Sequence, residues 1–327
     1  MSAIYVLGAG AIGISLAALL KATGREVYLL RSGLSSSAHP AKDQITGRIE
    51  ISSGDIVDYS LPLHSISDMD RPGGPLIICT KTMGNRELAA RFKLLSVDIP
   101  LLERPVILLQ NGLHVEHPFV EAGFTELYRG VLFVTAQQLG EGCIRLKPVN
   151  GTAVGLVRGS KAQLLQTLKT IQVPHFDFHL EEDIQRVAWK KAMLNCVFNS
   201  VCPLLETDNG IFHRNETAMI IAREMLSEAQ KVAAANGMDI GMEELESGLL
   251  AISRFSTGQE ISTLQDIRAG RLTEIGSLNF ELMRLANAAD PVIPTPLLGL
   301  AGRLTELKSI LNIEKHKNQS EWSKKTC

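Results

Sequence analysis

The segment I-Y-V-L-G-A-G-A-I-G at residues 4–13 decides the fold of this 327-residue chain. Its first four residues are expected to form an apolar strand, and the next six carry the glycine pattern G-x-G-x-x-G. Apolar residues recur at helical spacing over residues 14–20, Gly24 ends that helix, and residues 27–30 form a second apolar strand. A glycine pattern between a strand and a helix predicts a dinucleotide-binding unit of the Rossmann type.

The three glycines have separate physical roles in such a unit. Gly8 permits the tight turn, Gly10 lets the backbone approach a pyrophosphate, and Gly13 allows the helix to pack closely on the strand. The start of the helix adds backbone N–H donors and a positive potential. We therefore expect the cofactor to be bound by Gly8, Ala9, Gly10, Ala11, Ile12 and Gly13.

The end of the second strand indicates which cofactor is bound. NAD-binding units usually place an acidic residue there for the ribose hydroxyls, whereas this chain has Arg31 followed by Ser32. The guanidinium of Arg31 can pair with a 2′-phosphate, so the pattern favours NADP(H). The alternative is a solvated arginine on a loop.

Two further apolar runs, residues 75–80 and 105–109, are typical of buried parallel strands. Lys81 follows the first run and Asn111 follows the second, so both are expected at the carboxyl edge of the sheet, where such folds bind ligands. Taken singly, Lys81 could be a solvated helix start and Asn111 part of a turn. Three more strands are expected at residues 131–135, 143–146 and 152–157.

Past residue 180 the pattern becomes helical, which predicts an α/β chain with two domains. Residues 1–180 are expected to form the NADP-binding Rossmann-type domain, and residues 181–327 an all-helical substrate and catalytic domain. The acidic residues 181–183 are expected in the first turn of a long helix that Pro203 closes. Further helices are expected at 215–236, 242–253, 274–289 and 297–311, followed by a frayed polar tail.

Three polar residues share one face of that long helix. Lys191, Asn195 and Asn199 are spaced four residues apart, and nearly all residues between 192 and 201 are apolar. Burying a polar group without a partner costs about 1–3 kcal/mol, and a charge costs more. Folding alone does not require this arrangement, whereas a substrate pocket does.

A second group of polar residues lies at 262–275. Gly270 can end one helical piece and Thr273 can cap the next, which would place Glu274 in a first turn where its carboxylate is stabilised. A buried Lys191 needs an anion close by, and Glu274 is the best candidate. The alternative is that Glu274 pairs with Arg271.

Composition excludes several other classes of protein. A net charge of −2 gives no electrostatic basis for binding nucleic acid or a membrane surface, and no apolar run is long enough to span one. The five cysteines show no metal-ligand spacing, and with the scattered histidines they predict no metal site. Reduced thiols favour a cytoplasmic location. The composition is compatible with a monomer or a homodimer.

Several motifs recur in a fixed order along the chain. They are G-A-G-A-I-G at 8–13, Lys81 after a strand, Q-N-G at 110–112, W-K-K-x-x-x-N-x-x-x-N at 189–199, S-x-x-x-D-x-x-x-G-R-x-T-E-I at 262–275 and V-I-P-T-P at 292–296. This collinear set resembles the ketopantoate reductase family. The resemblance implies a Rossmann domain and a helical domain, with NADPH and a 2-oxo acid bound between them. The implied reaction is reduction of 2-dehydropantoate to (R)-pantoate in pantothenate and coenzyme A biosynthesis.

The resemblance also implies roles for individual residues. Lys191 would be the general acid that polarises and protonates the substrate's carbonyl oxygen, and Glu274 would accept its hydroxyl group. The substrate's polar groups would be held by Asn111, Asn195, Asn199 and Ser262. NADPH would be bound by the glycine turn and Arg31, with Lys81 and Asn111 nearby.

The chain departs from the family pattern at Gly276, Phe280 and the pair Asp290-Pro291. These positions adjoin the expected substrate side, so the alternative is an NAD(P)-dependent reductase of another bulky 2-oxo acid, as a D-2-hydroxyacid dehydrogenase would be. A third hypothesis is a protein that senses NADP(H) without catalysis. The set of Lys191, Asn195 and Glu274 argues against it, because a sensor needs only the first domain's contacts.

Overall fold

The computed structural model describes residues 3–33, 44–69, 74–97 and 100–325, with side chains described up to residue 318. Contacts divide the chain into two units. The first unit comprises residues 1–110 and 114–184, and the second comprises residues 111–113 and 185–327. The second unit therefore contains a short segment, residues 111–113, from within the first part of the chain, in addition to everything after Ile184.

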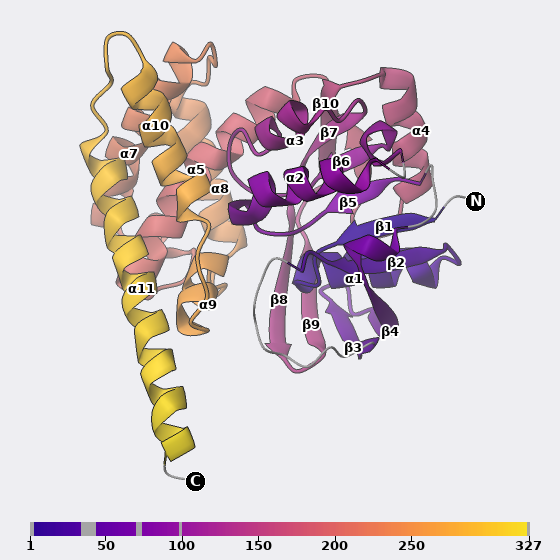
Figure 1. The fold of residues 1–327 in the computed structure, drawn as a ribbon. Coiled ribbons are helices and arrows are strands. Elements are labelled where there is room, and N and C mark those ends of the chain that lie inside the picture. The colour runs from indigo at the N-terminus through magenta and orange to yellow at the C-terminus, as the bar shows by residue number, and fades with distance from the viewer. Residues whose placement is uncertain (1–2, 34–43, 70–73, 98–99, 326–327) are drawn as a thin grey trace. The chain divides into compact units, whose positions relative to one another are not determined.

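The first unit is an α/β unit built on one mixed sheet (Figure 1). Six neighbouring strands are parallel, in the order β7-β6-β5-β1-β2-β4, so their carboxyl ends share one edge. The strands are β1 (Ile4–Leu7), β2 (Val27–Arg31), β3 (Gln44–Ile51), β4 (Ile56–Ser65), β5 (Leu76–Ile78), β6 (Val106–Leu108), β7 (Leu127–Val131), β8 (Val134–Gly140), β9 (Cys143–Pro148), β10 (Thr152–Arg158) and β11 (Phe178–Leu180). The helices are α1 (Ala11–Ala22), α2 (Asn85–Leu95), α3 (His117–Ala122) and α4 (Lys161–Ile171).

Strand β1 supplies alternate side chains to two hydrophobic clusters. Ile4 and Val6 belong to a cluster that includes buried residues of α1 and α4. Tyr5 and Leu7 belong to a second cluster that includes residues of α2 and α3. Because successive side chains of a strand point to opposite faces, both faces of the sheet are covered by helices, as in a doubly wound fold.

Two parts of this sheet differ from the sequence prediction. Strands β3 and β4 form an antiparallel pair that was not predicted, because β3 alternates exposed and half-buried residues over most of its length and so lacks an apolar run. The expected strand at 131–135 is wrong. Strand β7 ends at Val131, and a separate strand, β8, begins at Val134. Strand β7 pairs with β6 and β10, whereas β8 pairs with β9.

The second unit is helical, with one large hydrophobic cluster to which the long helix contributes over several turns. Its helices are α5 (Ile184–Leu205), α6 (Ile211–Arg214), α7 (Glu216–Ala235), α8 (Met242–Phe255), α9 (Ser262–Arg268), α10 (Asn279–Ala288) and α11 (Pro296–Lys325). Within the described part of the chain, no helix combines the length and apolarity that crossing a membrane requires.

Three predicted helix limits are corrected. The acidic residues 181–183 precede α5, whose first residue Ile184 packs so closely on Gly155 that a Cβ there would lie 2.4 Å from it. Pro203 lies inside α5, which continues to Leu205 and ends before Glu206, a residue with a left-handed φ of 52°. Helix α11 runs to Lys325, because the predicted frayed tail is rich in residues of good helix propensity.

The start of α11 is fixed by a buried carboxylate from α7. Glu228 is 8% exposed, and its two oxygens accept the backbone N–H groups of Leu297 at 3.0 Å and Leu298 at 2.9 Å. These N–H groups lie in the first turn, where a helix has no backbone acceptors of its own. Glycines in α11 then allow close packing of α10, since a Cβ at Gly302 would lie 3.0 Å from the ring of Phe280.

Candidate active site

The turn between β1 and α1 is shaped by its three glycines. Gly8 has a left-handed φ of 120°, and a Cβ at Gly13 would lie 1.9 Å from the carbonyl oxygen of Gly8. A Cβ at Gly10, in contrast, would meet no atom of the protein within 4 Å. Packing therefore explains Gly8 and Gly13 but not Gly10, which leaves open space where the motif predicts a pyrophosphate.

The start of α1 fits a bound phosphate group. Gly10 is its N-cap and provides no side-chain cap, and the first turn contains no acidic residue. The first backbone N–H groups of a helix have no partner within it, so they can donate to an anion at this position. Backbone groups, rather than side chains, thus form this part of the site.

Two loops at the carboxyl edge of the sheet are held together by a buried pair of amides. Asn85 and Gln110 donate to each other at 2.9 and 2.7 Å, and both side chains are 4% exposed. Gln110 also donates to the carbonyl of Thr80, and Asn85 donates to that of Val115. The residues just before Lys81 and Asn111 are therefore fixed relative to each other. Gln110 belongs to the Q-N-G motif, whereas Asn85 was missed because a single asparagine at a helix start carries no distinctive pattern.

Asn111 lies in the segment that belongs to the second unit. Its amide donates to Glu274 Oε2 at 3.3 Å, and the N–H of Leu113 donates to the carbonyl of Ser277 at 3.2 Å. Gly112, with a φ of 103°, packs so closely that a Cβ would lie 2.5 Å from that carbonyl oxygen. The structure thus brings together Asn111 and Glu274, two residues predicted from motifs 163 positions apart.

The polar face of α5 is partly buried. Lys191 and Asn195 are half-buried, whereas Asn199 is only 5% exposed. Asn199 Oδ1 accepts the hydroxyl of Thr263 at 2.6 Å, and its Nδ2 donates to the carbonyl of Asn195 at 3.0 Å. Asn199 therefore links α5 to the first turn of α9, which presents the exposed Ser262. Thr263 was missed in the sequence because a threonine on a helix carries no distinctive pattern.

The two adjacent lysines of α5 have different surroundings. Lys190 Nζ lies 2.8 Å from Glu244 Oε1, and the same carboxylate accepts Arg186 Nη1 at 3.2 Å. The hydrogen bonds from Arg186 and then Lys190 hold the pKa of Glu244 below its usual value. Lys190 is thus part of a link between α5 and α8, whereas Lys191 lies on the face of Asn195 and Asn199.

The segment before α10 differs from its prediction. Thr273 does not cap a helix with Glu274 in its first turn. Glu274 instead precedes a short 3-10 turn at Ile275–Ser277, and α10 begins at Asn279. Arg271 Nε lies 2.9 Å from Asp266 Oδ1, so its guanidinium pairs with an acidic residue of the preceding helix, α9. Glu274 is half-buried and accepts from Asn111.

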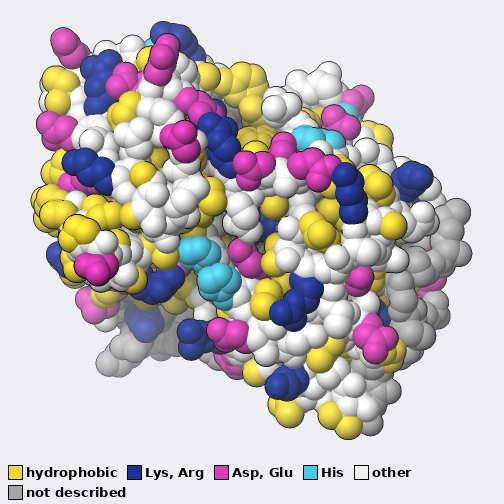
Figure 2. Space-filling view, turned by 90° about the horizontal axis from the view of Figure 1, so that it is seen from above, with side chains coloured by type: hydrophobic (Ala, Val, Ile, Leu, Met, Phe, Trp, Pro, Cys, Tyr) yellow, Lys and Arg dark blue, Asp and Glu magenta, His cyan; other side chains and the backbone are white. Residues whose placement is uncertain are grey.

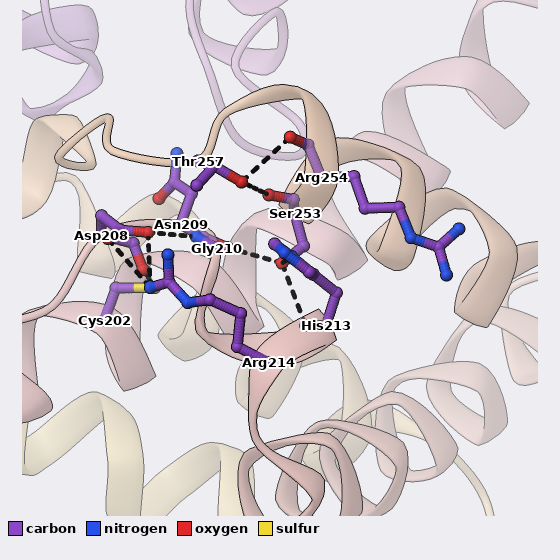
Figure 3. Close-up of polar contacts among 9 residues, drawn as sticks. All are labelled: Cys202, Asp208, Asn209, Gly210, His213, Arg214, Ser253, Arg254 and Thr257. Carbon is purple, nitrogen blue, oxygen red and sulfur yellow. Dashed lines mark hydrogen bonds and ion pairs between the residues drawn. The ribbon is translucent and has the colours of Figure 1, made fainter.

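A serine and a histidine also lie together in the second unit (Figure 3). Ser253 Oγ donates to the carbonyl of Asn209 at 2.8 Å and lies 3.0 Å from His213 Nδ1. The single hydroxyl proton is used on Asn209, so the imidazole nitrogen donates and cannot act as a base toward this serine. Ser253 is also fully buried. The pair therefore holds the loop after α5 in place and is no nucleophilic centre.

Among the described residues, no cluster of three or more histidine, cysteine or acidic side chains could hold a metal ion. The described cysteines are free thiols, and burial raises the pKa of Cys79 and Cys202 to about 12. On the face shown in Figure 2, acidic and basic side chains are interspersed rather than gathered into a field of one sign.

Both parts of the chain match models of a known protein family. Residues 4–159 match the family model described as "Ketopantoate reductase PanE/ApbA", and residues 183–309 match "Ketopantoate reductase PanE/ApbA C terminal". The chain is 26% identical over 298 residues to the 2-dehydropantoate 2-reductase of Pyrococcus abyssi (strain GE5 / Orsay), covering 90% of this chain and 94% of that protein. It is also 26% identical over 313 residues to that of Pyrococcus horikoshii, covering 94% and 98%.

Solved structures share the fold over nearly the whole chain. The ternary structure of D-mandelate dehydrogenase with NADH and anilino(oxo)acetate has a TM-score of 0.79 at 21% identity, covering 95% of this chain and 99% of that one. A PanE/ApbA family ketopantoate reductase from Ralstonia eutropha JMP134 has a TM-score of 0.76 at 24% identity, with the same coverage. The predicted fold, a Rossmann-type unit followed by a helical one, is confirmed.

Proposed function

Because the chain belongs to the ketopantoate reductase PanE/ApbA family, we propose that it reduces 2-dehydropantoate to (R)-pantoate with NADPH. The observation that carries the proposal is the hydrogen bond between Asn111 and Glu274, which joins two of the family's motifs, in a chain whose glycine turn leaves open space for a dinucleotide. The first unit then binds the cofactor, and the second unit, which includes Asn111, carries the groups that act on the substrate.

The cofactor's pyrophosphate is bound by backbone N–H groups at the start of α1, over the open space at Gly10. Arg31, the last residue of β2, pairs with the 2′-phosphate, and Lys81 adds positive charge at the end of β5. The nicotinamide, when bound, supplies the hydride. The relative whose structure contains NADH is D-mandelate dehydrogenase, so the choice of NADPH for this chain rests on Arg31.

Lys191 acts as the general acid in this proposal. Reduction of a carbonyl leaves negative charge on its oxygen, and an adjacent ammonium group stabilises that charge and then supplies the proton. Lys191 is suited to this role by its half-buried position, since electrostatic interactions are stronger where water is excluded. Lys190 is not, because its charge is neutralised by Glu244.

The remaining polar residues bind and orient the substrate. The amide of Asn195 and the hydroxyl of Ser262 hydrogen-bond to the carboxylate and hydroxyl groups of the substrate. The carboxylate of Glu274 accepts a hydrogen bond from the substrate's hydroxyl group, and Asn111 orients the Glu274 carboxylate. Asn199 offers an N–H donor and, through Thr263, fixes the start of α9 that carries Ser262.

The test is steady-state NADPH oxidation with 2-dehydropantoate and a panel of other 2-oxo acids. The proposal predicts the highest kcat/KM for 2-dehydropantoate in the wild type, with turnover largely lost in Lys191→Ala. Equal rates for the two proteins would contradict the role of the lysine. Arg31→Ala should weaken NADPH binding much more than NADH binding, and an equal loss would contradict its contact with the 2′-phosphate.

A second candidate keeps the fold and chemistry but changes the substrate to another bulky 2-oxo acid. It is favoured by the likeness to D-mandelate dehydrogenase and by the departures from the family pattern before α11. Phe280 itself packs on α11 at Gly302, which gives that departure a structural explanation. A kcat/KM for 2-dehydropantoate far below that for an aryl or branched 2-oxo acid would select this candidate. Cofactor binding without turnover on any of them would instead indicate a sensor.

A further inference from the structure

A second guanidinium lies at the end of β2, beside the position proposed for the 2′-phosphate. Arg91, on α2, donates from Nη1 to the carbonyl oxygen of Ser32 at 2.8 Å. Ser32 directly follows Arg31, so two arginines that are 60 positions apart in the sequence reach the same turn of the backbone. Arg91 is half-buried, which distinguishes it from a fully solvated surface arginine.

The approach of Arg91 depends on the glycine after Ser32. Gly33 has a left-handed φ of 66°, and a Cβ at this position would lie only 2.8 Å from Arg91 Nη1. Any side chain at residue 33 would therefore meet the guanidinium. The absence of a side chain at Gly33 thus leaves room for this group from α2.

The geometry of this contact also orients the guanidinium. The group is planar and carries five N–H donors, of which the bond to Ser32 uses one. Holding one edge of the group lowers the entropy that is lost when another edge binds an anion. The strand end itself is fixed, because Arg31 is aligned with Ser65 on the neighbouring strand β4.

We propose that Arg91 is a specificity-determining residue that binds the 2′-phosphate of NADP(H) together with Arg31. The phosphate carries close to two negative charges, so two guanidinium groups match it better than one. This inference rests on the proposed use of NADPH. It adds that discrimination against NADH is shared between β2 and α2, where the sequence pattern alone indicates only Arg31.

The test compares two nucleotides that differ only in the 2′-phosphate, adenosine 2′,5′-bisphosphate and 5′-AMP. Their dissociation constants are measured by titration calorimetry for the wild type, Arg91→Gln and the matched control Arg86→Gln, an exposed arginine on the same helix. Loss of a charge-assisted contact should weaken the bisphosphate by about tenfold or more in Arg91→Gln and leave 5′-AMP nearly unchanged. Arg86→Gln should affect neither.

Two further variants keep the inference testable if Arg91→Gln is unstable. Arg91→Lys keeps the charge but loses the planar fork, and Gly33→Ala keeps the arginine but displaces it. Both should reduce the ratio of the two affinities without abolishing it. If every Arg91 variant weakens both nucleotides equally, Arg91 only supports the backbone and the inference is wrong. A wild type that does not prefer the bisphosphate would instead overturn the proposed use of NADPH.

Discussion

The turn between β1 and α1 and the polar face of α5 are both candidate binding surfaces, but they are built in different ways. The turn uses backbone groups and missing side chains within six consecutive residues, Gly8 to Gly13. The α5 surface uses side chains, and its Asn199 is joined to Thr263 of α9, a segment far away in the sequence. The same helical unit contains a second long-range pair, Asn111–Glu274. A backbone site can therefore be recognised from local sequence, whereas a side-chain site needs the folded helical unit.

The largest effect that would test this contrast is expected at Lys191. Lys191→Met removes the charge but keeps most of the stem, and we expect kcat to fall by a factor of about 10² to 10⁴, as for loss of a general acid. Cofactor binding should be little changed. Lys190→Met is the matched control, since that lysine pairs with Glu244. A similar loss of kcat in both variants, measured at saturating substrate, would assign the effect to the helix rather than to Lys191.

Two glycines of the turn should separate stability from binding. Gly13→Ala places a Cβ 1.9 Å from a backbone oxygen and should lower the free energy of unfolding by about 3 kcal/mol or more. Gly10→Ala meets open space and has an allowed backbone conformation, so it should leave Tm nearly unchanged while weakening the cofactor. Thermal unfolding and a cofactor titration measure the two effects. Loss of Tm in Gly10→Ala would mean that this glycine also serves packing.

The link between α5 and α9 should have an intermediate effect. Thr263→Val keeps the shape of the side chain but leaves the buried Oδ1 of Asn199 without its donor, which should cost about 1–3 kcal/mol in the free energy of unfolding. KM should rise more than kcat falls, because Ser262 is displaced. In urea unfolding, Thr257→Val serves as control, since it makes the same change on an exposed residue. Equal costs for both variants would argue against a special role for the link.

The smallest effect is expected from Glu244, and it depends on pH. Its pKa is lower in the folded protein than its usual 4.5, so its contribution to stability is complete above that value and is lost as pH falls through the lower folded pKa. Because Glu244 and Lys190 are about one-third exposed, the contribution is about 1 kcal/mol or less. The difference in unfolding free energy between wild type and Glu244→Gln should shrink as pH is lowered below about 4. A constant difference would exclude the ion pairs as its cause.

Parts of the fold with a strong local pattern were predicted well. The β1 and β2 strands, α1 and the parallel strands β5 and β6 follow from apolar runs and glycines. The pair β3–β4 was missed because its residues alternate with weak contrast, and it is held instead by pairing with neighbouring strands. The ends of α5 and α11 were also missed, since packing at Gly155 and helix propensity outweighed the local acidic and polar signals.

By itself the sequence determined the dinucleotide turn, the shared face of Lys191, Asn195 and Asn199, and the order of the family's motifs. These features depend on spacing along one chain segment, which geometry converts directly into position. The tertiary structure alone decided that Lys190 is engaged by Glu244, that Thr263 holds Asn199, and that Arg91 reaches the end of β2. Such contacts join segments that only the packing of the helices and the sheet brings within hydrogen-bonding distance.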